Sequence, residues 1–213
     1  MVKQLLDRAR RRLTVLTLIG SVTLLIGGCD VDDNPHKSET VKGDDAVALI
    51  DSMRSKGSFD EARQRLNATA RVIGERIAAA IPGQTWRFSD DPNLLKTASE
   101  GLSCEKLTGD IARRPKADAV VFGRTFSADE FKTAADVVRQ EAAPYGATNE
   151  SSLFNDQPRR DYDVQGNGFE FNLGQIEVAT LTITGDCFLL QRTLDLPAGQ
   201  LPPEPPIVPT STR

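Results

Sequence analysis

A run of 16 uncharged residues near the N-terminus, residues 13–28, most restricts what this chain can fold into. A basic head precedes the run, with Lys3 and four arginines up to Arg12, and the run ends on small residues. A basic head, an apolar middle and a small-residue exit are the three parts of a secretory signal. The run is also shorter than the ~20 apolar residues of a membrane-spanning helix. We therefore expect residues 1–28 to be a signal peptide, so the fold must be built from the rest.

The four residues at the end of this run are Ile26, Gly27, Gly28 and Cys29. They resemble the lipobox of bacterial lipoproteins, in which small residues give the signal peptidase access to the bond before the cysteine. The thiol receives a diacylglyceryl group, and cleavage then makes Cys29 the N-terminus. The sequence thus predicts lipidation at Cys29 and a polar, flexible tether over 29–45. The alternative is an uncleaved anchor helix with an incidental cysteine.

The charge of the mature chain argues against one class of partner. The whole chain has a formal net charge of −4, but the export segment contributes five cations and one carboxylate, so its removal leaves −8. Binding to nucleic acid depends largely on Lys and Arg neutralising phosphates. We therefore expect no nucleic-acid partner, and membrane attachment through the lipid on Cys29 instead.

Two cysteines remain once Cys29 is lipidated. Cys104 and Cys187 lie far apart in an exported chain, and a disulfide between them is the simplest prediction. Two buried free thiols, or a metal or redox pair, are the alternatives. A metal pair is disfavoured because neither cysteine lies in a Cys-x-x-Cys motif and the only histidine, His36, lies in the predicted tether.

Helical segments can be located from apolar periodicity and from capping residues. A first helix is predicted over 44–56. Capping boxes at Ser58 and Ser127, each with a glutamate three residues later, predict helices over 58–81 and 127–143. A further short helix is predicted over 105–113.

Strands are predicted mainly in the second half of the chain. Asn167-Gly168 between alternating segments indicates a tight hairpin, because both residues tolerate positive φ. The segment 176–184 is predicted to be the longest strand, since it is rich in Val, Thr and Ile. The other predicted strands are 84–88, 117–122, 147–154, 161–165, 169–173 and 187–191.

This order predicts an α+β fold, in which an antiparallel sheet of four or five strands has its helices packed on one face. The signal peptide and tether precede a single domain over 46–195. A proline-rich tail, 196–213, follows it and should be extended.

The sequence contains no catalytic constellation that we can identify. With one histidine, Ser-His-Asp and Cys-His sites are not available, and we expect no metal and no cofactor. Asp161 and Asp163 share one side of a predicted strand, as a carboxylate hydrolase acting on wall glycans would require, but such pairs also occur on solvated faces. Five aromatic residues could pack in the core or line an apolar ligand cavity: Trp86, Phe88, Phe122, Phe126 and Phe131.

Several longer stretches resemble the mycobacterial LppA/LppB family of lipoproteins. These stretches are 48–54 (ALIDSMR), 80–86 (AIPGQTW), 110–115 (DIARRP), 161–168 (DYDVQGNG), 185–191 (GDCFLLQ) and 194–203 (LDLPAGQLPP). The resemblance covers most of the chain and implies that Cys29 is the lipidated residue, on the outer side of the cell membrane. It brings no activity that can be assigned to positions of this chain.

The leading hypothesis is therefore a lipid-anchored envelope protein that binds or scaffolds another molecule without catalysis, its partner an envelope protein or a lipid. The alternatives are a carrier that holds a lipid or glycolipid in an apolar cavity, and the carboxylate-dependent glycan hydrolase.

Overall fold

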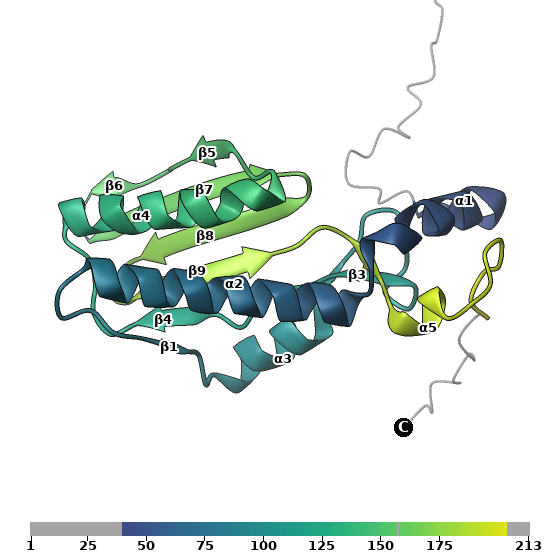
Figure 1. The fold of residues 1–213 in the computed structure, drawn as a ribbon, viewed down its shortest axis with the longest axis horizontal. Helices are drawn as coiled ribbons and strands as arrows, with labels where there is room; N and C mark the ends of the chain where they lie inside the picture. Colours follow the sequence, from purple (N-terminus) through teal and green to yellow (C-terminus); the bar gives the residue numbers. More distant parts are fainter. Residues whose placement is uncertain (1–39, 157, 204–213) are drawn as a thin grey trace, which may run out of the picture. The chain divides into compact units, whose positions relative to one another are not determined.

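An antiparallel sheet of seven strands forms the centre of the described chain (Figure 1). The computed structural model describes residues 40–156 and 158–203. The predicted signal peptide, Cys29 and the end of the proline-rich tail lie outside these residues. The sheet has the order β1-β4-β9-β8-β7-β5, with β6 also paired to β7. Its strands are β1 (Trp86–Phe88), β4 (Val120–Phe122), β5 (Asn149–Ser151), β6 (Asn155–Asp156), β7 (Arg159–Gly166), β8 (Phe169–Gln175) and β9 (Ala179–Thr184).

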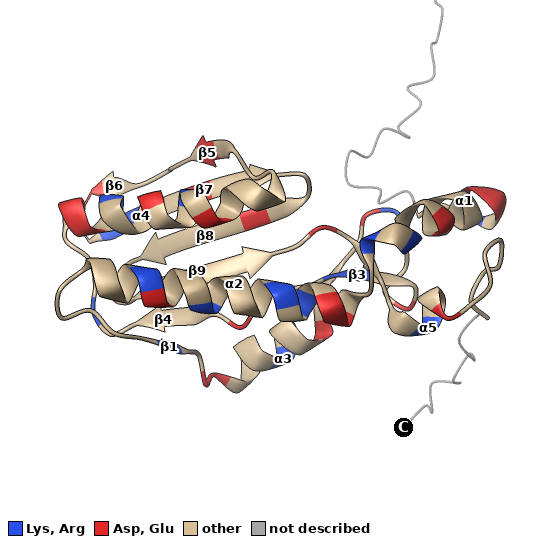
Figure 2. Ribbon diagram, viewed as in Figure 1, with Lys and Arg blue, Asp and Glu red and all other residues tan. Residues whose placement is uncertain are grey.

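The two long helices, α2 (Phe59–Ala80) and α4 (Ala128–Ala142), both pack on one face of this sheet (Figure 1). Both begin at the predicted capping boxes: Ser58 Oγ accepts a hydrogen bond from the Glu61 amide, and Ser127 Oγ accepts one from the Glu130 amide. Their outer surfaces carry charges of both signs interspersed along the helices (Figure 2). The predicted α+β architecture is confirmed, with a sheet larger than the four or five strands expected.

The main core lies between these helices and the sheet. The predicted aromatic group belongs to it: Phe122 packs against Phe126 with ring centroids 5.1 Å apart, and Trp86 packs edge-on against Phe88 at 5.4 Å. Trp86 also covers Gly74 of α2, where a Cβ atom would lie within 2.6–3.0 Å of the indole ring. The helix can therefore approach β1 because position 74 has no side chain.

The β7–β8 hairpin turns at Asn167-Gly168 as predicted, with φ values of 48° and 80°. The prediction for the next strand was partly wrong, because β9 begins only at Ala179, and β7, not β9, is the longest strand. Residues 176–178 form the turn between β8 and β9, with Ile176 and Val178 exposed. Their β-branched character indicates a strand but cannot show where the chain reverses.

The helix predicted over 105–113 was also wrong. A helix, α3 (Pro92–Glu100), lies earlier, and residues 105–111 form turns. Asp91 caps α3, since its Oδ1 accepts hydrogen bonds from the Asn93 and Leu94 amides at 2.8 and 3.1 Å, and Pro92 occupies the first helical position. Asp followed by Pro is a local helix-start signal that does not depend on apolar periodicity.

A second, smaller lobe is formed by a three-stranded antiparallel sheet and short helices. The strand order is β10-β3-β2, and its core includes Ile50, Met53, Leu107 and Leu189. Its elements are α1 (Gly43–Met53), η1 (Arg54–Lys56), β2 (Leu102–Ser103), β3 (Ala112–Arg114), β10 (Phe188–Leu189) and α5 (Gln191–Leu194), while η2 (Ala143–Tyr145) follows α4 in the main layer. Because its strands have only two or three residues, this lobe needs support beyond ladder hydrogen bonds.

We expect Gly74→Ala to destabilise the chain by about 1–3 kcal/mol, because the added methyl would displace the Trp86 ring. Chemical denaturation measures the loss, and a red shift of Trp fluorescence reports greater exposure of the indole. Gly174→Ala is the matched control, since its Cβ would meet only Asn172 Oδ1, at 3.4 Å. Equal stability of the two variants would contradict the proposed Gly74–Trp86 contact.

Candidate functional site

An open cavity of about 440 Å³ lies beside the Cys104–Cys187 disulfide in the smaller lobe. Its walls come from α1 and η1, from the loop after β2, from the end of β3, from the β7–β8 turn and from the segment between β9 and β10. The lining residues are Leu49, Ser52, Met53, Lys56, Cys104, Glu105, Lys106, Leu107, Arg114, Gly168, Asp186 and Cys187.

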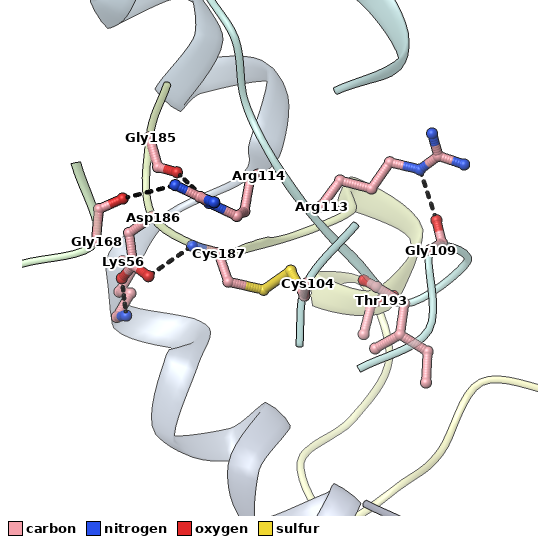
Figure 3. The surroundings of a disulfide bond; sticks show 11 residues. Lys56, Cys104, Gly109, Arg113, Arg114, Gly168, Gly185, Asp186, Cys187 and Thr193 are labelled. Carbon is pink, nitrogen blue, oxygen red and sulfur yellow. Dashed lines mark hydrogen bonds and ion pairs between the residues drawn. A yellow bond between two sulfur atoms is a disulfide. The ribbon is translucent and has the colours of Figure 1, made fainter. Parts of the chain in front are cut away.

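The disulfide itself joins two segments that are 83 residues apart (Figure 3). Cys104 follows β2 and is buried, while Cys187 precedes β10 and is half-buried, and their Cα atoms are 5.7 Å apart. This is the pairing that the sequence predicts. It fixes the loop after β2 against the segment that connects the main sheet to the smaller one.

An ion pair links η1 to the residue before Cys187. Lys56 Nζ lies 2.6 Å from Asp186 Oδ2, and Asp186 Oδ1 accepts a hydrogen bond from the Cys187 amide at 2.7 Å (Figure 3). The Asp186 carboxylate thus holds both a side chain and the backbone at the cavity wall. Both partners are partly exposed, so the pair itself adds little to stability.

Arg114 fixes the backbone around Asp186. Its Nε donates to the Gly185 carbonyl at 3.0 Å and its Nη2 to the Gly168 carbonyl at 3.3 Å (Figure 3). Gly168 belongs to the β7–β8 turn, and a Cβ atom there would lie 2.6 Å from Asp186 Oδ1. The turn and Asp186 therefore approach closely because this residue is a glycine.

Two other arginines of this lobe also donate to backbone carbonyls. Arg113 binds the carbonyls of Gly109 and Glu100, and Arg192 binds the carbonyl of Asp110 with two nitrogens. A guanidinium carries five N–H donors, so it can satisfy loop carbonyls that have no partner in a regular ladder. These bonds hold the turns at 105–111 in place.

Arg54 ties the beginning of the predicted proline-rich tail to η1. It donates to the carbonyls of Leu194, Leu196 and Pro197 at 2.9–3.1 Å. Its Nε also pairs with Asp51 Oδ1 at 2.8 Å, which lowers the pKa of Asp51. The tail is thus attached to the lobe at its start.

The carboxylates considered for hydrolysis are used in other ways. Asp161 accepts hydrogen bonds from the amides of Leu153 and Phe154, and Asp163 accepts one from Asn172 Nδ2 at 2.8 Å. They do share one face of β7, opposite the helices, but each serves its own local contact. Among residues 40–156 and 158–203, no cluster of three or more His, Cys, Asp or Glu side chains could hold a metal ion.

Two buried polar side chains near α4 were not identified from the sequence. Arg160 is 6% exposed and its Nε has no hydrogen-bond partner among the described residues, while its Nη1 is 3.4 Å from the Phe126 carbonyl. The hydroxyl of Tyr162 is likewise buried without a partner, and burial raises its pKa. Both residues alternate with Asp161 and Asp163 along β7, so they face the helices.

No helix within the described part of the chain is long and apolar enough to cross a membrane.

Comparison with known proteins gives the family of this chain. The family described as "Lipoprotein confined to pathogenic Mycobacterium", LppA, matches residues 34–191. The chain belongs to the LppA family. Among its relatives in Mycobacterium tuberculosis H37Rv is "Putative lipoprotein LppA", which is 63% identical over 202 residues, covering 95% of this chain and 92% of the relative. "Putative lipoprotein LppB" of the same strain is 61% identical over the same shares of both chains.

A solved structure supports the fold of this LppA-family chain. The crystal structure of LppA from Mycobacterium tuberculosis aligns with a TM-score of 0.75 and 66% identity. The alignment covers 76% of this chain and 95% of the solved one. The family resemblance expected from the sequence stretches is confirmed.

We expect the double variant Cys104→Ser/Cys187→Ser to lose roughly 4 kcal/mol of stability, because the disulfide closes a loop of more than 80 residues. Native-state hydrogen exchange should show faster opening of α1, β3 and β10, while the amides of β7 and β8 remain better protected. Loss of protection to the same extent in both sheets would show that the disulfide does not act locally on the smaller lobe.

Proposed function

We propose that this chain is a lipid-anchored protein on the outer face of the cell membrane that binds an anionic ligand or partner group, without catalysis, in the cavity beside the Cys104–Cys187 disulfide. The anchor is the diacylglyceryl group on Cys29. The ligand class is a carboxylate- or phosphate-bearing molecule or segment.

The anchor is supported by the lipobox-like tetrad at residues 26–29 and by the relatives. Both the family description and the names of the LppA and LppB relatives contain the word lipoprotein. These relatives align over 95% of this chain, so the match includes nearly all of it.

The observation that carries the binding proposal is the charge of the cavity. Three cations, Lys56, Lys106 and Arg114, line it against two carboxylates, Glu105 and Asp186. A local excess of positive charge in a mature chain of net charge −8 favours an anionic group at this place over the rest of the surface.

The fixed walls of the cavity support the same proposal. The disulfide holds one wall, the Arg114–carbonyl bonds hold another, and the Lys56–Asp186 pair joins them. A binding site built from such constrained segments loses less conformational entropy when a ligand binds.

The shape of the cavity favours the anionic ligand over the lipid-carrier alternative. Five of its twelve lining residues are charged and the cavity is open, whereas a carrier must enclose an acyl chain. The non-enzymatic part of the proposal rests on the sequence, which has no histidine between residues 37 and 213 to act as a general base.

Replacement of Cys29 tests the anchor. We expect Cys29→Ala, expressed with its leader in a mycobacterial host, to incorporate no labelled fatty acid, because the acceptor thiol is gone. Mass spectrometry should also find no chain that begins at residue 29. The Cys104→Ser/Cys187→Ser variant is the control and should keep the label. Fatty-acid labelling of Cys29→Ala would place the lipid on another residue.

A charge reversal tests the cavity. Citrate and inorganic phosphate, titrated into residues 38–213, should shift the NMR amide signals of 104–107 and 186–187. We expect Lys106→Glu to weaken this binding by about tenfold, because it reverses one of the cavity's exposed charges.

Lys132→Glu makes the same change of net charge on an exposed position of α4, away from the cavity, and should bind as the unsubstituted chain does. If neither anion shifts the cavity signals, or if both variants weaken binding equally, the cavity is not the anion site.

A further inference from the structure

The most exposed large apolar side chains of the described residues gather at one end of the main sheet. Leu153 is 82% exposed, Ile176 58%, Val178 54% and Phe154 49%. This end, where β6 lies and where β8 ends, is the end away from the smaller lobe (Figure 1). We call these four residues, together with Arg159, the sheet tip.

The strand register places these residues side by side. Phe154 accepts a hydrogen bond from the Asp161 amide, and Asp161 pairs with Gly174 in β8. Arg159 lies two residues before Asp161, and its guanidinium is 5.9 Å from the centroid of the Phe154 ring.

Ile176 lies two residues after Gly174 and Val178 two residues before Thr180, and Gly174 pairs with Thr180. Both side chains therefore lie on the face of the sheet opposite the helices. The Ile176 amide bonds to the Val178 carbonyl at 3.3 Å. An open hollow of about 440 Å³ adjoins both of them.

The sheet tip has no excess of positive charge, since one cation stands against two neighbouring carboxylates. Arg159 pairs in register with Asp156 of β6, and Glu177 lies between Ile176 and Val178 in the turn. Apolar contact, and not attraction of charge, is therefore the interaction that this surface offers. The Arg159 guanidinium lies over the Phe154 ring, and this charged end can remain at a polar boundary while the apolar side chains go deeper.

The extent of the surface indicates which occupant it fits. Its four apolar side chains together expose on the order of 500 Å², taking ~200 Å² for a large apolar side chain. A standard protein interface buries about 800 Å² on each partner. The surface is thus too small for a stable contact with a second copy, but loops that present a few large apolar residues suit insertion into a membrane interface.

The chain between Cys29 and α1 is long enough to let the sheet tip reach the bilayer. Residues 30–40, which precede the hydrogen bond from the Val41 amide to the Lys106 carbonyl, can span at most about 40 Å. Helix α2, which runs from the smaller lobe to the tip end of the sheet, has 22 residues and a length of about 33 Å.

We infer that the sheet tip is a membrane-contact surface, whose apolar side chains enter the interface of the bilayer that holds the lipid of Cys29. This inference rests on the proposed anchor. The contact is a second, weaker attachment that orients the domain, and the anchor remains the primary one.

Tryptophan quenching by brominated lipid tests this contact. The full lipidated chain is reconstituted in phosphatidylcholine vesicles with bromine on the acyl chains, as Ile176→Trp and, for control, as Leu94→Trp on α3, where the replaced side chain is 43% exposed. We expect several-fold greater quenching for Ile176→Trp than for Leu94→Trp, above the signal of Trp86 in the unsubstituted chain. High salt should not reduce it, because the contact is apolar.

Equal quenching of the two variants, or none in either, while the chains float with the vesicles, would overturn the membrane contact and leave the anchor intact. Chains that carry no lipid by mass spectrometry and do not float would instead contradict the proposed function. If quenching is absent but the Ile176→Trp emission shifts as the number of protein chains per vesicle increases, the sheet tip contacts a second copy.

Discussion

The apolar stripe of α2 is the interaction on which both parts of the structure depend. Its first turn places Phe59 and Ala62 against Phe188 of the smaller sheet, and its later turns place Ile73 and Ile77 in the main core. One helix of 22 residues thus sets the position of the two sheets relative to each other. Its capping box fixes where that stripe begins, and a bridge between Ser58 and Leu189 adds a backbone contact at the same point.

The smaller lobe shows how segments with little regular structure can be held. Its strands have two or three residues, so many loop carbonyls have no ladder partner. Arg54, Arg113, Arg114 and Arg192 donate to such carbonyls, and the disulfide supplies the covalent tie. Because a guanidinium bound to carbonyl oxygens keeps its charge, this way of building a lobe also increases its positive character. The cation excess of the cavity is partly a consequence of how its walls are held.

The sequence predicts the parts of the fold whose signals are local. Serine capping boxes located α2 and α4, and Asn167-Gly168 located the β7–β8 turn, because each of these is set by neighbouring residues. Strands of two or three residues, such as β6, contain too few positions for any periodicity, so the sheet was expected to be smaller.

The candidate site could be predicted only in part. Cys104 and Cys187 were paired correctly because an exported chain with two remaining thiols offers few other outcomes. Lys56 and Arg114 come from distant segments, and nothing in their local sequence shows that they meet. Asp186 and Lys106 lie within two residues of a cysteine, which is the one signal that could have found them.

Strand β8 connects this site to the opposite end of the sheet: it begins after Gly168 at the cavity and ends before Ile176, seven residues or about 24 Å later. If the sheet tip touches the bilayer, the cavity is therefore held away from it by the length of one strand. If β8 stands upright on the bilayer, that distance keeps the mouth of the cavity clear of the lipid head groups, although Cys29 and the cavity-lining α1 are close in sequence.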